Sequence, residues 1–174
     1  DESVDAELRD TGSDDAAAGD EEEVLGREVA DESGAAGAEG AININVLWEM
    51  GGAQEVLEGI LERTKGMVTG VTCGAGMPYK LSEIAERHNV HYLPIISSGR
   101  AFRALWKRAY HKVAHLMAAV VYEDPWLAGG HNGLSNAEDP KQPQDPYPRV
   151  KQLREMMRKE GVSEDVPIVM AGGV

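Results

Sequence analysis

The stretch from His115 to Gly133, HLMAAVVYEDPWLAGGHNG, joins a strongly apolar run to a glycine-rich turn that contains one histidine. The first eight residues have the length and composition of a buried β-strand. Gly129 and Gly130 then precede His131, and glycines let a backbone approach a ligand closely and offer it amide N–H groups. Imidazole titrates near neutral pH and can act as an acid, a base or a hydrogen-bond donor. We therefore interpret the turn as functional, with a surface turn that carries an incidental histidine as the alternative.

Apolar strands and amphipathic helices alternate on both sides of this stretch. Strands that recur at intervals of roughly 25 to 35 residues, with helices between them, indicate βαβ units and a parallel sheet. The expected strands are 41–48, 67–73, 90–97, 115–122 and 166–174. The expected helices are 52–66, 79–89, 99–112 and 147–161. The strands are apolar along their whole length, which is typical of a sheet covered on both faces.

Two architectures contain such units: an open doubly wound sheet and an arc of a (β/α)₈ barrel. Glycine-rich or polar turns follow four of the strands, at CGAGMP, ISSGR, EDPWLAGGHNG and AGGV, whereas the helix-to-strand connections are plain. A barrel builds its ligand site from the strand-to-helix loops of one face. The predicted fold is therefore α/β, of the (β/α)₈ TIM-barrel type, with only about five of the roughly eight βα units that a closed barrel needs.

The acidic charge of the chain is confined to its first part. Residues 1–40 hold 15 of the 30 acidic and 2 of the 17 basic side chains, so residues 41–174 are balanced. The first segment has few large apolar residues and cannot bury enough surface to offset the entropy of ordering. We expect an acidic disordered segment over 1–40, acting as a linker or as an interaction tail, and a partial barrel domain over 41–174.

Several classes of function are disfavoured by the sequence. Cys73 is the only cysteine, so no internal disulfide is expected, and we interpret this residue as a small core side chain rather than a nucleophile. The histidines lack the spacing of a metal site, and we expect no bound metal. Basic residues on the helix 99–112 have no interleaved aromatic side chains, which disfavours a nucleic-acid surface. No run is long enough to span a membrane and no secretory leader is visible, so we expect a cytoplasmic protein.

Two further strand ends contain candidate ligand-binding groups. Gly172 and Gly173 follow the last strand, and paired glycines at a barrel strand end can form a phosphate nest, a tight turn being the alternative. Ser98 follows the third strand and could bind a phosphate, although capping of the next helix is the commoner role of serine there. The pair Glu123–Asp124 could steer the polar edge of a cofactor or stabilise its own loop.

The turns, taken in order, resemble one family. GAGMP, a strand ending in ISS, AGGH and PIVMAGGV occur at intervals that resemble the nitronate monooxygenases, formerly called 2-nitropropane dioxygenases. Flavin-dependent enoyl-acyl-carrier-protein reductases and the enoyl-reductase components of polyunsaturated fatty acid synthases share this pattern. The resemblance covers residues 41–174. It departs from the family at Leu127, where members usually have a glutamate, and in the long proline-rich connector EDPKQPQDPYP.

The resemblance implies an FMN-binding TIM barrel whose flavin carries the redox chemistry. It implies that Gly129, Gly130, Gly172 and Gly173 hold the phosphate of FMN, and that His131 faces the substrate. The implied activity is oxidation of an alkyl nitronate by O₂ to a carbonyl compound and nitrite. The alternatives are a flavin-dependent enoyl-thioester reductase with a nicotinamide donor, and a non-catalytic barrel fragment. The expected partner is a small molecule, either a nitronate or an enoyl thioester, and a homo-oligomer is compatible with this interpretation.

Overall fold

The computed structural model describes residues 40–129, 133–134 and 138–173. The predictions for residues 1–39 and for Gly130 and His131 lie outside the described residues. The unit Ala41–Val174 contains all of the elements described below. Its strands are β1 (Ile42–Leu47), β2 (Val68–Gly74), β3 (His91–Ile96), β4 (Val120–Glu123) and β5 (Ile168–Ala171). Its helices are α2 (Ala53–Arg63), α3 (Leu81–His88), α4 (Gly99–Arg108) and α5 (Pro146–Lys159), with a 3₁₀ helix, η1 (Tyr110–Leu116).

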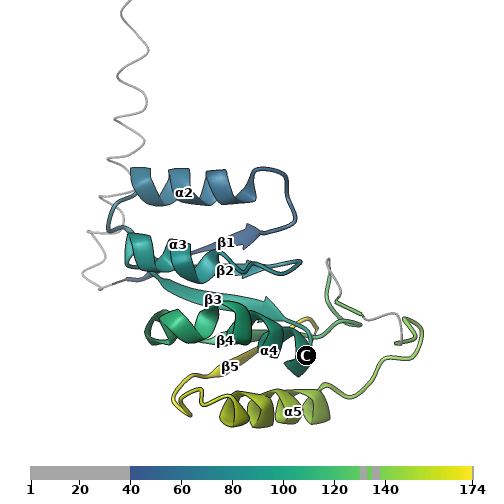
Figure 1. Ribbon diagram of the computed structural model, residues 1–174. Helices are drawn as coiled ribbons and strands as arrows, with labels where there is room; N and C mark the ends of the chain where they lie inside the picture. The colour runs from purple at the N-terminus through teal and green to yellow at the C-terminus, as the bar shows by residue number, and fades with distance from the viewer. Residues whose placement is uncertain (1–39, 130–132, 135–137, 174) are drawn as a thin grey trace, which may run out of the picture. The chain divides into compact units, whose positions relative to one another are not determined.

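The five strands form one parallel sheet in the order β1-β2-β3-β4-β5 (Figure 1). Each strand therefore pairs with the next strand along the chain. A doubly wound sheet reverses its strand order at a switch point, whereas a (β/α)₈ barrel adds its strands one after another. The observed order is that of a barrel arc, which agrees with the architecture expected from the sequence.

The helices cover one face of the sheet. Side chains that alternate along the strands, among them Val71 and Cys73 of β2 and Tyr92 and Ile96 of β3, are buried with helix residues in a single core cluster. The helical part of this core contains Leu57 of α2, Leu81 and Ile84 of α3, Phe102 and Leu105 of α4, and Leu153 and Met157 of α5. These residues occur at the three- and four-residue spacings that place them on one side of each helix.

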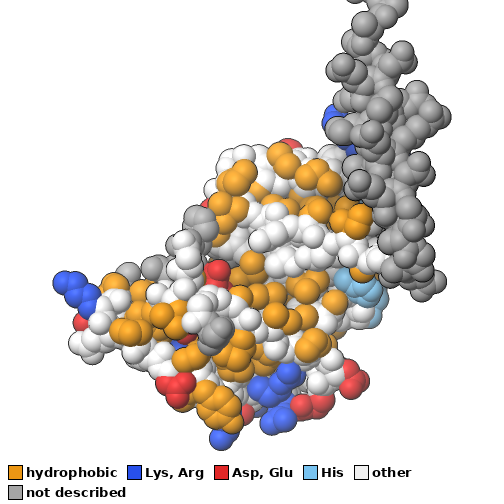
Figure 2. Space-filling model, turned by 180° about the vertical axis from the view of Figure 1, so that it is seen from behind, with side chains coloured by type: hydrophobic (Ala, Val, Ile, Leu, Met, Phe, Trp, Pro, Cys, Tyr) orange, Lys and Arg blue, Asp and Glu red, His pale blue; other side chains and the backbone are white. Residues whose placement is uncertain are grey.

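The opposite face of the sheet is only partly covered, contrary to the expectation from continuously apolar strands. Leu93, Ile95 and Val121 on this face are half-buried, and Val169 is exposed. Figure 2, which views the protein from behind, shows hydrophobic side chains gathered on this side. In a closed barrel this face becomes the packed interior, which explains why both faces of these strands are apolar in sequence.

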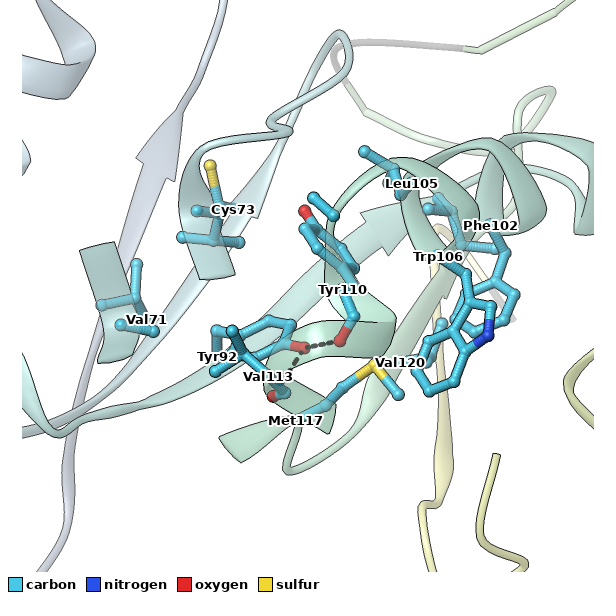
Figure 3. Packing of buried hydrophobic residues seen from close by; sticks show 14 of the residues in the cluster. Val71, Cys73, Tyr92, Phe102, Leu105, Trp106, Tyr110, Val113, Met117 and Val120 are labelled. Atoms are coloured by element: carbon cyan, nitrogen blue, oxygen red, sulfur yellow. Dashed lines mark hydrogen bonds between the residues drawn. The ribbon is translucent and has the colours of Figure 1, made fainter. Parts of the chain in front are cut away.

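Two tyrosines organise the middle of the core (Figure 3). The rings of Tyr92 and Tyr110 meet edge to face, with their centroids 5.0 Å apart. The Tyr92 hydroxyl lies 3.1 Å from the carbonyl oxygen of Val113 and donates to it, and the Tyr110 hydroxyl donates to the carbonyl oxygen of Pro78 at 2.8 Å. Burial raises the pKa of both phenols, so both remain neutral hydrogen-bond donors.

The expected helix 99–112 and strand 115–122 are both wrong at the point where they meet. Helix α4 ends at Arg108, and Ala109 leaves the helical region with a φ of −142°. A 3₁₀ helix follows to Leu116, and β4 begins only at Val120. Tyr92 accounts for the difference, because its hydroxyl binds the carbonyl group of Val113 inside η1, and no local sequence pattern indicates a partner from β3.

Candidate functional site

The carboxyl ends of the parallel strands meet at one edge of the sheet, and a cavity of about 790 Å³ lies there. The turn after β2 forms one wall, and its backbone is unusual, since Ala75 has a φ of 55° and Gly76 a φ of 90°. Non-glycine residues rarely adopt positive φ, and such positions gather at ligand sites. The other lining residues are Glu49, Met77, Ile95, Ile96, Ser97, Ser98, Arg100, Ala101, Ala104, Glu123, Gly133, Leu134 and Glu138.

The glycine turns after β4 and β5 lie against one another. A Cβ atom at Gly172 would lie 3.1 Å from the Asp124 nitrogen and 3.4 Å from the Ala128 Cα, and one at Gly173 would lie 3.1 Å from the Leu127 oxygen. Both glycines also have positive φ, of 97° and 73°. A side chain is therefore disfavoured at either position, both by contact and by backbone conformation.

The amides of these turns remain available to a ligand. The N–H groups of Gly129, Gly172 and Gly173 make no hydrogen bond with another described residue. Gly129 directly follows Ala128, which Gly172 approaches closely, so these amides belong to two turns that are in contact. Concave groups of backbone N–H donors are a common way to bind a phosphate or another anion. We call Gly129, Gly172 and Gly173 the glycine cradle.

The remaining predicted residues are placed as follows. Ser98 lines the cavity, but its Oγ accepts a hydrogen bond from the Ala101 nitrogen at 3.3 Å and so caps α4. Glu123 lines the cavity, whereas Asp124 is fully buried and accepts backbone hydrogen bonds within its own loop. The cavity and the glycine cradle share no lining residue, and they meet at the pair Glu123–Asp124.

Arg149 is an organising residue that the sequence pattern did not indicate. Its guanidinium group donates to the Tyr122 hydroxyl at 3.1 Å, to the carbonyl oxygen of Ser97 at 3.1 Å and to the carboxylate of Glu138. It also lies 4.9 Å from the centre of the Trp126 ring. Ser97 and Glu138 both line the cavity, so the hydrogen bonds from Arg149 hold two residues of the cavity lining in place. The only sequence signal was a basic residue at the start of a predicted helix, which usually faces solvent.

The electrostatics of this cluster keep Arg149 charged. Burial disfavours its positive charge, but the hydrogen bonds to Glu138 and Tyr122 outweigh burial and raise the pKa of the guanidinium group. Burial also raises the pKa of Tyr122, and the bond from Arg149 partly offsets that rise. Tyr122 is therefore a neutral acceptor for Arg149 at physiological pH.

Cys73 is confirmed as a core residue. Its side chain is fully buried on the helix-covered face (Figure 3), and burial raises the pKa of its thiol to about 12. We expect native Cys73 to react with iodoacetamide at pH 8 at least about a thousandfold more slowly than the unfolded chain, because the thiolate is the reactive form. Mass spectrometry of protein labelled with and without denaturant measures this ratio, and similar rates in the two states would contradict the buried placement.

Two other classes of site have no support among the described residues. Within 40–129, 133–134 and 138–173, no group of three or more His, Cys, Asp or Glu side chains is arranged to hold a metal ion. None of the helices in the same ranges combines the length and the apolar character needed to cross a membrane.

Comparisons with known proteins identify the fold. No family model matches the chain, and no curated protein matches it significantly. Among solved structures, FabK from Thermotoga maritima is similar, with a TM-score of 0.57 and 17% sequence identity over 90% of this chain. Its M276A mutant has the same TM-score, with 18% identity over 87% of this chain. The chain spans about two fifths of the length of these FabK structures. At these identities the likeness shows the fold, which is an arc of a (β/α)₈ barrel.

Proposed function

We propose that this chain forms the cofactor-binding part of an FMN-dependent oxidoreductase. One observation carries the proposal: the glycine turns after β4 and β5 lie in contact beside the cavity at the carboxyl ends of the strands. In barrels of this type the ligand site is built at that face. The likeness to FabK supports the same conclusion.

The phosphate of FMN fits the glycine cradle. Its amides have no protein partner among the described residues, and Cβ atoms at Gly172 and Gly173 would lie only 3.1 Å from backbone atoms of the turn after β4. When bound, the flavin supplies the redox chemistry. The protein contributes backbone donors at the cradle and a cavity lined by apolar side chains, among them Met77 and Ile95, and by charged ones such as Arg100. Ser98 remains a weaker candidate ligand, since its Oγ already caps α4.

Two substrate classes are compatible with this site. The first is an alkyl nitronate, oxidised to a carbonyl compound and nitrite, and it follows from the AGGH and AGGV motifs. The second is an enoyl thioester, reduced with electrons from a nicotinamide, and the likeness to FabK supports it equally. In both cases we assign the catalytic role to His131 from its motif alone. Anaerobic addition of NADH, of NADPH or of propyl-2-nitronate to the flavin-loaded protein separates the two classes by which compound bleaches the flavin absorbance.

The phosphate site is tested by comparing the affinities of FMN and riboflavin. We expect Gly173→Ala to reduce the preference for FMN over riboflavin by roughly tenfold or more, because a methyl group forces the cradle apart and weakens at least one charge-assisted hydrogen bond. Gly161→Ala is the matched control, since Gly161 has a similar φ of 79° and a Cβ added there would meet nothing within 4 Å. Flavin fluorescence quenching measures both affinities.

Three results would argue against the proposal. If neither flavin binds, the chain is not a flavoprotein. If riboflavin binds as tightly as FMN, the glycine cradle does not hold a phosphate. If Gly161→Ala and Gly173→Ala change the preference equally, backbone strain is the cause and not the cradle.

A further inference from the structure

Asp124 is a buried acidic residue that the proposed function does not use. It directly follows β4, and none of its surface is exposed to solvent. Burying a carboxylate is costly unless hydrogen bonds compensate for the loss of water. A buried acid at this position is therefore expected to make hydrogen bonds that compensate for this cost.

The Asp124 carboxylate folds the turn that follows it. Its Oδ1 accepts hydrogen bonds from the backbone nitrogens of Trp126 and Leu127, both at 2.9 Å. The carbonyl oxygen of Asp124 accepts from the Ala128 nitrogen, also at 2.9 Å. Three hydrogen bonds to one residue thus fix the path of the backbone from Asp124 to Ala128.

The same turn is the surface against which the last strand ends. The Asp124 nitrogen donates to the carbonyl oxygen of Ala171 at 2.9 Å, which joins the turn to the end of β5. A Cβ at Gly172 would meet the Asp124 backbone, and one at Gly173 would meet Leu127. A displacement of the turn therefore moves the surface on which both glycines rest.

The second carboxylate oxygen of Asp124 contributes no hydrogen bond to the turn. Oδ2 of Asp124 is buried and has no hydrogen-bond partner among the described residues. An unpaired buried oxygen lowers stability, so the stabilising contribution of this side chain comes from the hydrogen bonds to Oδ1. An asparagine could place a carbonyl oxygen at the same point without the charge.

We propose that Asp124 is the positioning residue of the glycine cradle. Through Oδ1 it sets the turn from Asp124 to Ala128, and this turn holds Gly172 and Gly173 with their amides available to an anion. The part of this inference that concerns the anion rests on the proposed function, whereas the coupling between the turn and the glycines does not.

Hydrogen exchange of the protein without flavin tests the coupling. In Asp124→Ala we expect the amides of Trp126 and Leu127 to exchange at least about tenfold faster, because each loses its hydrogen bond to Oδ1. The amides of Gly172 and Gly173 have no hydrogen bond to lose, so their displacement is measured as a change in their NMR chemical shifts. The amides of β2 should be unchanged. Asp124→Asn should stay within about twofold of the wild type, since its amide oxygen can replace Oδ1.

Asp145 provides a matched control. It is the cap of α5, and its Oδ1 accepts from the Tyr147 nitrogen at 3.0 Å in a similar local turn. Asp145→Ala should accelerate exchange near Tyr147 and leave Gly172 and Gly173 unchanged. A comparison of FMN and riboflavin affinities then tests the cradle itself: we expect Asp124→Ala to lose at least about tenfold of the preference for FMN, and Asp124→Asn and Asp145→Ala to retain it.

The possible outcomes separate this inference from the proposed function. If the chemical shifts of the Gly172 and Gly173 amides are unchanged in Asp124→Ala, the positioning role is overturned. It is also overturned if Asp124→Asn behaves like Asp124→Ala, since an acceptor oxygen at the position of Oδ1 would then not be enough to set the turn. If the wild type shows no preference for FMN, the proposed function fails, and the exchange and chemical-shift data still decide whether Asp124 positions the glycines.

Discussion

Replacement of Arg149 with methionine is expected to lower the free energy of unfolding by about 3 kcal/mol, the cost typical of breaking a buried ion pair. The substitution keeps an apolar side chain of similar length but removes three hydrogen bonds, to Tyr122, Ser97 and Glu138. It also removes the contact of the guanidinium group with the Trp126 ring. Both side chains of the Arg149–Glu138 pair are more than four-fifths buried, so water can replace the lost interactions only in part.

Arg158 provides the control within the same helix. Its pair with Glu164 is more than half exposed on both sides, and exposed pairs contribute little to stability. Urea denaturation of Arg149→Met, Arg149→Lys and Arg158→Met measures the three costs. Arg149→Lys should recover part of the loss, because lysine keeps the charge but not the planar group that reaches three partners. Equal destabilisation by Arg149→Met and Arg158→Met would show that the cluster does not hold the cavity wall.

Replacement of Gly74 with alanine is expected to destabilise the protein by about 1–3 kcal/mol through overpacking. A Cβ at Gly74, the last residue of β2, would lie 2.6 Å from the Cβ and 3.0 Å from the Cδ1 of Ile95. The Cβ of Ile95 is fixed by the backbone of β3, so the side chain cannot turn away from the contact. Two neighbouring strands would have to separate at the edge that carries the cavity.

Two further variants make the test specific. Gly59→Ala in α2 is expected to stabilise the protein by about 0.5–1 kcal/mol, because the added Cβ would meet nothing within 4 Å and alanine favours a helix. Ile95→Gly removes the atom with which the new methyl group collides, so Gly74→Ala should cost less in that background. An identical cost of Gly74→Ala with and without Ile95 would rule out the proposed contact.

The fold could be predicted from local patterns because each βα unit contains its own signals. The apolar runs from Ile42 and Val68, and the helical spacing of Leu57 and Leu61, correspond to elements of the structure. Glycine-rich or polar turns after four of the five expected strands favoured the barrel over the open doubly wound sheet. The partial covering of the second face of the sheet could not be predicted, because the sequence of an apolar strand is the same whether a helix or the interior of a barrel covers it.

The candidate site was only partly accessible from the sequence. The turn at Gly172 and Gly173 could be identified because glycine adopts positive φ more readily than other residues, and both have positive φ in the structure. Arg149 could not, because it is separated from Tyr122 by 27 positions and the two meet only after α5 has packed. Glycine doublets therefore indicate a ligand turn locally, whereas a buried arginine cluster depends on tertiary packing.

The consecutive strand order also determines how the sheet can assemble. Every strand pairs with the strand before it in sequence, so each pairing closes a loop that contains only one helical connection. The entropy lost when such a loop closes grows slowly with its length. No pairing has to wait for a distant segment to be synthesised. Folding from the amino terminus on the ribosome can therefore proceed one unit at a time, and the junction of β4 and β5, where the glycine cradle lies, forms after the units of β1 to β3.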